Sequence, residues 1–150
     1  MKGPLQVAAA AVLGAGVERC FACAADVAAY PRWIPEIVAV DLGRLDGGGR
    51  ALEATFLVEA LGRGLRTTLR YDYGDAPRSF AWRQSAGDLL AAFEGRYEFT
   101  PALEDPESTE VSWLARVELA ADVPAFVLRR AETRAASAAL DGLRRALQLP

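Results

Sequence analysis

Two cysteines and the lack of histidine limit the chemistry open to this chain. Cys20 and Cys23 form a C-x-x-C spacing inside a predicted helix, not at a helix N-terminus, where the dipole would lower a thiol pKa. We therefore interpret both as structural cysteines on a buried helix face. Without histidine there is no Ser-His-Asp or Cys-His arrangement, and a zinc site would have only these thiols and carboxylates. The sequence predicts no metal and no cofactor.

Three of the polar side chains predicted to face the interior are the best candidates for contacting a bound molecule. Tyr71, Gln84 and Tyr97 fall on the apolar face of their predicted strands. Each has the chemistry to hydrogen-bond a carbonyl or hydroxyl of a bound molecule, although a tyrosine hydroxyl can equally reach water at a cavity mouth. The same alternation places no carboxylate on this face, so general acid-base catalysis by paired carboxylates is not expected.

A run of six predicted strands positions these side chains. Apolar and polar residues alternate along it, and Arg66 and Arg70 fall on the outer face, where we expect them to pair with Glu53 or Glu59. Asp46 and the three glycines after it form a strong hairpin signal, because adjacent glycines accept positive φ freely. The spacing predicts an antiparallel meander of strands over residues 36–45, 50–61, 65–73, 79–85, 89–100 and 110–121.

Two elements are predicted before the meander. Leu5–Leu13 is apolar and is followed by glycines, and we interpret it as a strand rather than as part of a short signal peptide. Residues 17–30 carry apolar side chains at helical spacing, and Pro31 is predicted to end that helix. The segment from Pro31 to Pro35 is predicted to be a tight connection or one short helical turn.

A long amphipathic helix is predicted over residues 124–149, with Asp122 as its cap and Pro124 in its first turn. At 1.5 Å per residue it would be about 37 Å long. The predicted apolar stripe of this helix comprises Val127, Leu128, Ala131, Ala135, Ala138, Ala139, Gly142, Leu143 and Ala146.

The middle of this stripe is almost all alanine and glycine, whereas the inner face of the sheet carries large aromatic side chains. No other long amphipathic element is predicted that could cover the sheet. The small residues either let the helix pack closely on bulky side chains or leave room for a bound molecule, and both explanations stay open. The residues predicted to line such a cavity are Phe56, Leu69, Tyr71, Trp82, Gln84, Phe93, Tyr97, Trp113, Val127, Ala131, Ala135 and Ala138.

The order of elements is similar to that of the START-like, or helix-grip, superfamily, which includes polyketide cyclase/dehydrase-type proteins. The most specific match is residues 26–35 (DVAAYPRWIP), which resemble the family's segment after its first helix. Weaker matches run from Trp82 to Gly87, over residues 95–101 (GRYEFTP) and over residues 126–131 (FVLRRA). Coenzyme Q-binding relatives place an aromatic residue and a cysteine after the second proline, where this chain has Glu36 and Ile37.

The resemblance implies an α+β fold. In it, a curved antiparallel meander wraps around the long C-terminal helix, with two short helices after the first strand. It also implies that the inner face of the sheet and the last helix enclose a pocket for lipids, polyketides, quinones or other apolar ligands.

Composition narrows the class of partner. The chain has 150 residues, of which 52% are hydrophobic and 25% charged, and we expect one domain over residues 1–150. A net charge of −3 argues against general nucleic-acid binding, which depends on neutralising phosphates. No run approaches the roughly 20 apolar residues of a membrane span, so stable membrane insertion is not expected. The lack of a disulfide framework fits a cytoplasmic location, and composition does not determine the oligomeric state.

Three functional hypotheses remain. The first is binding or transport of a small hydrophobic ligand, such as a lipid, a polyketide or an isoprenoid-like molecule, in an internal cavity. The second is a polyketide aromatase/cyclase or dehydratase, in which tyrosine or arginine residues move protons. The third is a protein-interaction module with a filled core and no ligand. The shortage of inward polar groups favours a non-enzymatic role.

Overall fold

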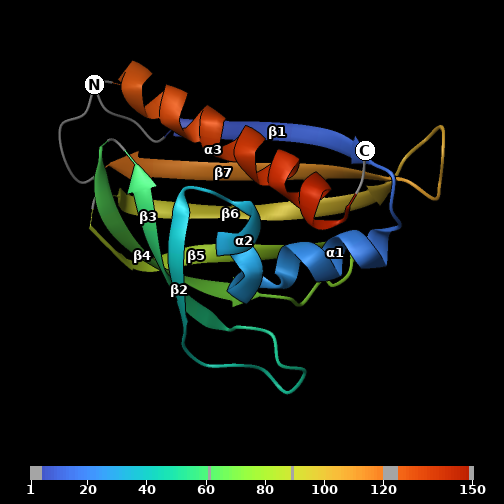
Figure 1. Cartoon of the computed structure of the whole chain (residues 1–150), viewed down its shortest axis with the longest axis horizontal. Helices are drawn as coiled ribbons and strands as arrows, with labels where there is room; N and C mark the ends of the chain where they lie inside the picture. The colour runs from blue at the N-terminus through green and yellow to red at the C-terminus, as the bar shows by residue number, and fades with distance from the viewer. Residues whose placement is uncertain (1–4, 61, 89, 120–124, 149–150) are drawn as a thin grey trace.

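The strands of the protein form one continuous antiparallel sheet. The computed structural model describes residues 5–60, 62–88, 90–119 and 125–148. Strands β2 to β7 each lie beside their neighbours in sequence, and β1 pairs with β7, giving the order β1-β7-β6-β5-β4-β3-β2 (Figure 1). The strands are β1 Leu5–Leu13, β2 Ile37–Leu42, β3 Glu53–Ala60, β4 Arg63–Asp72, β5 Ser79–Gly87, β6 Leu90–Pro101 and β7 Thr109–Leu119.

The helices cover the sheet at two places. α1 (Val17–Ala25), the 3-10 turn η1 (Val27–Ala29) and α2 (Tyr30–Trp33) follow β1, and α1 packs against β6 and β7. α3 (Ala125–Ala146) crosses the sheet over β1 and β7 and meets α2 near its C-terminal end (Figure 1). This arrangement confirms the predicted fold class. The predicted cap Asp122 and first-turn Pro124 lie outside the described residues.

The prediction of one helix over residues 17–30 was wrong. α1 ends at Ala25 because Asp26, at φ −82° and ψ 74°, leaves the helical region. The chain then forms η1, and α2 begins at Tyr30, one residue before Pro31. Proline is tolerated in the first turn of a helix, where no N–H donor is needed, so Pro31 starts a helix here instead of ending one.

The hairpin predicted at Asp46 is confirmed. Its Oδ1 accepts hydrogen bonds from the backbone N–H groups of Gly48 and Arg50, both at 2.9 Å. Gly49 adopts a φ of 87°, the left-handed conformation that favours glycine. The two flanking strands are shorter than predicted, because β2 ends at Leu42 and β3 begins at Glu53. An isolated bridge between Leu45 and Ala51 pairs the chain closer to the turn.

The buried side of α3 is rotated from the predicted stripe. Ala135, predicted to be inside, is exposed, and Ala138 is half-buried. Alanine occurs on several sides of the helix, so the spacing of apolar residues left its rotation ambiguous, and contact with larger neighbours decided it. The residues buried on or just after α3 are Ala136, Ala139, Leu140, Gly142, Leu143 and Leu147.

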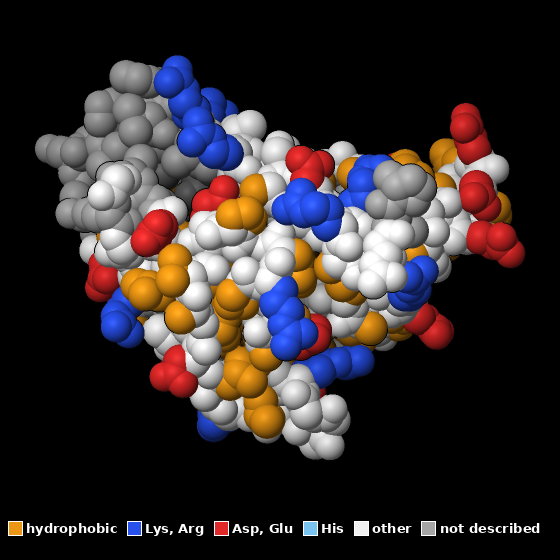
Figure 2. Space-filling model, in the orientation of Figure 1, with side chains coloured by type: hydrophobic (Ala, Val, Ile, Leu, Met, Phe, Trp, Pro, Cys, Tyr) orange, Lys and Arg blue, Asp and Glu red, His pale blue; other side chains and the backbone are white. Residues whose placement is uncertain are grey.

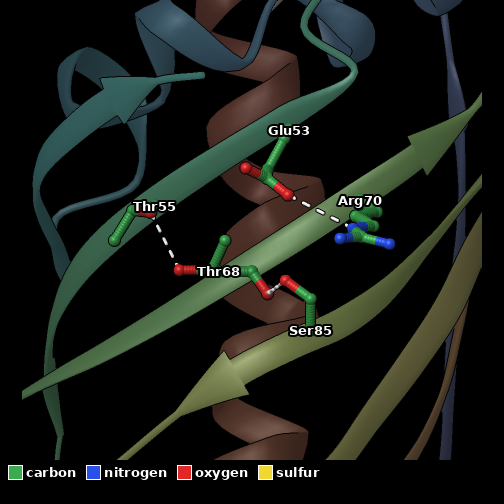
Figure 3. Close-up of polar contacts among 5 residues, drawn as sticks. All are labelled: Glu53, Thr55, Thr68, Arg70 and Ser85. Atoms are coloured by element: carbon green, nitrogen blue, oxygen red, sulfur yellow. Dashed lines mark hydrogen bonds and ion pairs between the residues drawn. The ribbon is translucent and has the colours of Figure 1, made fainter. Parts of the chain in front are cut away.

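The outer face of the sheet is polar and points away from α3 (Figure 3). Arg70 donates to Glu53 at 3.2 Å, which confirms the predicted pairing of these residues across β3 and β4. The hydroxyls of Thr55 and Thr68 lie 2.8 Å apart beside them. An exposed ion pair of this kind contributes at most about 1 kcal/mol to the free energy of unfolding. The polar contacts on this face therefore keep it hydrated and add little to stability.

Charge is mixed over the face of the molecule seen in Figure 2. Acidic, basic and apolar side chains alternate over this view, with acidic side chains gathered at the tip of the loop between β6 and β7. No helix within the described ranges has both the length and the apolar character needed to cross a membrane.

Aromatic side chains fill the part of the interior beside α1. Phe21 of α1 meets Phe80 and Phe99 edge-on, with ring centroids 5.5 and 5.6 Å apart. Phe80 also lies 5.2 Å from the ring of Tyr97. The three phenylalanines are at most 2% exposed, so this region is close-packed.

Candidate ligand-binding cavity

A cavity of about 220 Å³ lies between the inner face of the sheet, α2 and α3. Six neighbouring strands, β2 to β7, contribute to its wall, and α3 contributes two alanines. The lining is apolar except at a few positions. Its described members are Tyr30, Ile34, Glu36, Ile37, Phe56, Val58, Leu65, Arg66, Thr67, Leu69, Tyr71, Trp82, Gln84, Leu90, Phe93, Tyr97, Trp113, Ala135 and Ala139.

Three aromatic rings from adjacent strands form one wall of the cavity. The ring of Trp82 on β5 lies 5.8 Å from that of Phe93 on β6 and 5.7 Å from that of Trp113 on β7. Gly95, which pairs with Trp82, leaves the space into which the indole of Trp82 fits. Because each ring contacts the next, this wall is held in shape by its own packing.

Most of the residues predicted to line a cavity meet at this one. Ala138 is half-buried and is not among the described lining residues, and the side chains of Val127 and Ala131 lie outside the described part of the chain. Ala135 lines the cavity although it is exposed, which places it at an edge of the cavity. The predicted residues found on the wall are Phe56, Leu69, Tyr71, Trp82, Gln84, Phe93, Tyr97, Trp113 and Ala135.

The amide of Gln84 is largely occupied by the protein itself. Its Oε1 accepts a hydrogen bond from the hydroxyl of Thr67, and its Nε2 donates to the carbonyl of Leu90, both at 2.8 Å. These bonds tie β4 and β5 to the start of β6 at one end of the cavity. Gln84 therefore has less capacity left for a ligand than its inward position suggests.

The expectation that no carboxylate faces the interior was wrong, because Glu36 lines the cavity. Its Oε2 is buried and has no hydrogen-bond partner among the described residues. The alternation rule missed Glu36 because this residue precedes β2, and only its carbonyl joins the sheet, accepting the N–H of Glu59 at 2.8 Å. Its side-chain direction is set by the turn in which Ile37 N–H donates to the Ile34 carbonyl.

Some lining residues that were not predicted could have been found from the alternation of the strands, and others could not. Val58, Leu65 and Thr67 continue the inward alternation of their strands, so the pattern was sufficient to find them. Arg66 was predicted on the outer face, and it reaches the cavity close to a register shift in the pairing of β4 with β5. Tyr30, by contrast, comes from α2, whose position depends on tertiary contacts.

The two cysteines have the environment of structural thiols. Both are free thiols. Cys20 is buried and donates to the carbonyl of Ala15, and Cys23 is half-buried. Burial raises the pKa of both thiols, which disfavours the reactive thiolate. Over the described ranges, no group of three or more His, Cys, Asp or Glu side chains is arranged to hold a metal ion.

Residues 4–148 match the family described as polyketide cyclase / dehydrase and lipid transport. The chain belongs to this family. The match spans nearly the whole length of the chain, so every element around the cavity is part of the polyketide cyclase/dehydrase fold. No curated protein matches the chain.

Solved structures show that this family's fold is shared at low sequence identity. A START superfamily protein from Mycobacterium smegmatis has a TM-score of 0.86 and 21% identity, covering 95% of this chain and 97% of that one. The Zhui aromatase/cyclase from Streptomyces sp. R1128 has a TM-score of 0.85 and 18% identity, covering 97% and 94%. Such likeness establishes the fold, and the function has to be argued from the cavity itself.

All four tyrosines of this family member are at least partly buried, and burial changes their acidity. Burial is the main reason why the pKa values of Tyr30, Tyr71 and Tyr97 lie well above the usual value of 10.0. Burial likewise raises the pKa of Tyr73 to about 12. The cavity tyrosines therefore keep their protons and can act as hydrogen-bond donors, and they are poor general bases.

This shift predicts a loss of stability in alkali. Phenols in the unfolded chain ionise near pH 10, whereas in the folded protein they stay protonated, so unfolding releases protons and is favoured as the pH rises from 10 toward 12. We expect the melting temperature to fall by roughly 5 °C or more over this interval and less in a Tyr73→Phe variant. Thermal melts combined with phenolate absorbance check this; native protein that shows full phenolate absorbance near pH 10 would contradict it.

Proposed function

We propose that the protein binds a small hydrophobic molecule in the cavity between the sheet and α3. The observation that carries the proposal is the cavity of about 220 Å³, walled by Trp82, Phe93 and Trp113. An apolar cavity of about 150 Å³ is enough to bind benzene, whereas drug-sized ligands occupy about 300–1,000 Å³. The ligand is thus a compact molecule of one or two rings, or a short lipid, polyketide or isoprenoid-like segment.

Unsatisfied polar atoms support the same assignment. Among the described residues, two buried side-chain polar atoms lack hydrogen-bond partners, Oε2 of Glu36 and Nε1 of Trp82. Both residues line the cavity. Leaving such a group without a partner costs about 1–3 kcal/mol, so a ligand that donated to Glu36 or accepted from Trp82 would recover part of that cost.

We propose binding rather than cyclisation because of the chemistry of the lining. A cyclase or dehydratase needs a group that accepts a proton, and burial makes the tyrosines reluctant to ionise. Glu36 is a single carboxylate within the described lining, whereas general acid-base chemistry commonly uses two groups of different pKa. The hypothesis of an interaction module predicted a filled core, and the cavity argues against that form of it.

A pair of helix variants tests the proposal. Ala139 lines the cavity from α3 and is 5% exposed, so Ala139→Leu places new methyl groups in the cavity. We expect it to weaken binding of naphthalene, used as an apolar probe, by about tenfold or more. The new methyl groups take up space that the probe would fill, and each CH or CH₂ group that the probe can no longer bury is worth about 0.8 kcal/mol. The affinity is measured by calorimetric titration of the purified protein.

Ala138→Leu is the matched control, because it makes the same change one residue away, outside the described lining. It should bind naphthalene as the wild type does. Native mass spectrometry adds an independent readout, since a molecule that co-purifies with the wild type should be lost from Ala139→Leu and retained by Ala138→Leu. Equal naphthalene affinities for all three proteins would overturn the proposal.

A further inference from the structure

We infer that Glu36 selects ligands with a hydroxyl group, accepting a hydrogen bond from an apolar molecule that carries a neutral donor at one end. This inference rests on the proposed function and specifies the class of ligand. Glu36 lines the cavity, and its Oε2 is buried with no partner among the described residues. A carboxylate oxygen accepts hydrogen bonds and donates none, so the group that satisfies it has to be a donor.

The position of Glu36 places this donor at one end of the cavity. Ile37, the next residue, pairs with Val58, and Val58 pairs with Leu65 at the start of β4. Thr67 and Leu90 lie toward the same end of the sheet, where Gln84 bridges them. Trp82, Phe93 and Trp113 supply the apolar wall. The cavity thus offers an aromatic surface for the body of the ligand and an acceptor for its hydroxyl.

The surroundings favour a neutral donor over an ion. Apart from Glu36 and Arg66, the described lining residues are uncharged, so bringing in a cation would mean desolvating its charge at a cost of several kcal/mol. A carboxylate ligand would place a second negative charge beside Glu36. No described cationic group forms a salt bridge with Glu36, so its hydrogen-bonding capacity is not used in an ion pair.

Three naphthalene derivatives of similar shape test this selection. The probes are naphthol, methylnaphthalene and naphthoate, each substituted at the same ring position and titrated calorimetrically into the full chain. A hydrogen bond to a charged acceptor is expected to make naphthol bind about tenfold or more tightly than methylnaphthalene. Naphthoate should bind more weakly than methylnaphthalene. Indole N–H resonances of Trp82 and Trp113 should shift on binding, which reports that the probe occupies the cavity.

Glu36→Leu should abolish the preference for naphthol over methylnaphthalene. Its melting temperature should equal or exceed that of the wild type, because replacing an unsatisfied buried acceptor by an apolar group removes a cost. Glu59→Leu is the matched control. The side chain of Glu59 is exposed, and its backbone N–H donates a hydrogen bond to the carbonyl of Glu36. Glu59→Leu therefore removes one negative charge close to Glu36 without changing the cavity wall, and it should keep the preference for naphthol.

The possible outcomes separate the two levels of the proposal. If no probe binds, the proposed function fails and this inference fails with it. If methylnaphthalene binds and shifts the indole resonances but naphthol binds no more tightly, the binding function stands and the role of Glu36 is overturned. Tighter binding of naphthoate, or a naphthol preference that survives in Glu36→Leu, would also overturn that role.

Discussion

Replacing Gly142 by alanine is expected to destabilise the protein by about 3 kcal/mol and to lower its melting temperature by roughly 10 °C. A Cβ atom on Gly142 would meet the backbone carbonyl oxygen of Trp33 and lie 2.7 Å from Cε3 of the same residue. Alanine is normally favoured over glycine inside a helix by about 1 kcal/mol, and here the clash outweighs that gain. The contact partner includes backbone, so relief requires α3 and α2 to move apart.

The effect of Gly142→Ala should extend to the cavity. α2 carries Tyr30, whose ring stacks on Phe56 at 5.9 Å, and both residues line the cavity. Displacing α2 therefore changes the wall as well as the stability. Ser137→Ala is the control on the same helix, because Ser137 is exposed and the change should be neutral or slightly stabilising. A Gly142→Ala protein that melts at or above the wild-type temperature would contradict the predicted helix contact.

Gly95→Ala should be nearly as damaging, costing about 2–3 kcal/mol. A Cβ atom on Gly95 would meet the carbonyl oxygen of Leu114 on β7 and lie 2.5 Å from Cζ2 of Trp82 on β5. The indole occupies the space that a side chain at position 95 would need, so the ring has to tilt away or β6 has to move. Since Trp82 is part of the aromatic wall, naphthalene affinity should fall together with stability.

Gly64→Ala provides the control for Gly95→Ala. Gly64 also lies in a strand, but its Cβ atom would be 3.6 Å from Cδ1 of Leu57, an ordinary van der Waals contact. Its melting temperature should stay close to the wild-type value. Chemical denaturation of the two variants measures the difference, and equal free energies of unfolding would show that the space at Gly95 is not limiting.

The order of the strands and the inward face of most of them could be predicted from the sequence. Alternation in a strand has a period of two, so Phe56, Leu69, Tyr71, Trp82 and Trp113 are assigned to one face by their neighbours alone. All five line the cavity. The turn at Asp46 and the start of β1 at Leu5 were likewise predictable, because local chemistry and short-range patterning fix them.

The helices were less predictable, for two different reasons. Alanine on several sides of α3 leaves its rotation undetermined, and packing against larger neighbours made Ala136 and Leu140 the buried positions. The break after α1 depends on the backbone of Asp26. Glu36 was predicted to be the first residue of a strand, but it precedes β2, so the alternation of that strand does not set its direction and its place in the cavity lining was missed.

The sequence by itself therefore determined the two surfaces that face each other, an aromatic inner sheet and a helix of small residues. Only the tertiary structure decided how much space is left between them. That space depends on how closely α2 and α3 approach, which Gly142 and Trp33 set by direct contact, and on how aromatic rings from distant strands share the interior. Phe21, Phe80 and Phe99 fill one end, and a cavity of about 220 Å³ remains beside Trp82. Local patterning specifies which side chains point inward, whereas the volume they leave is a property of all of them packed together.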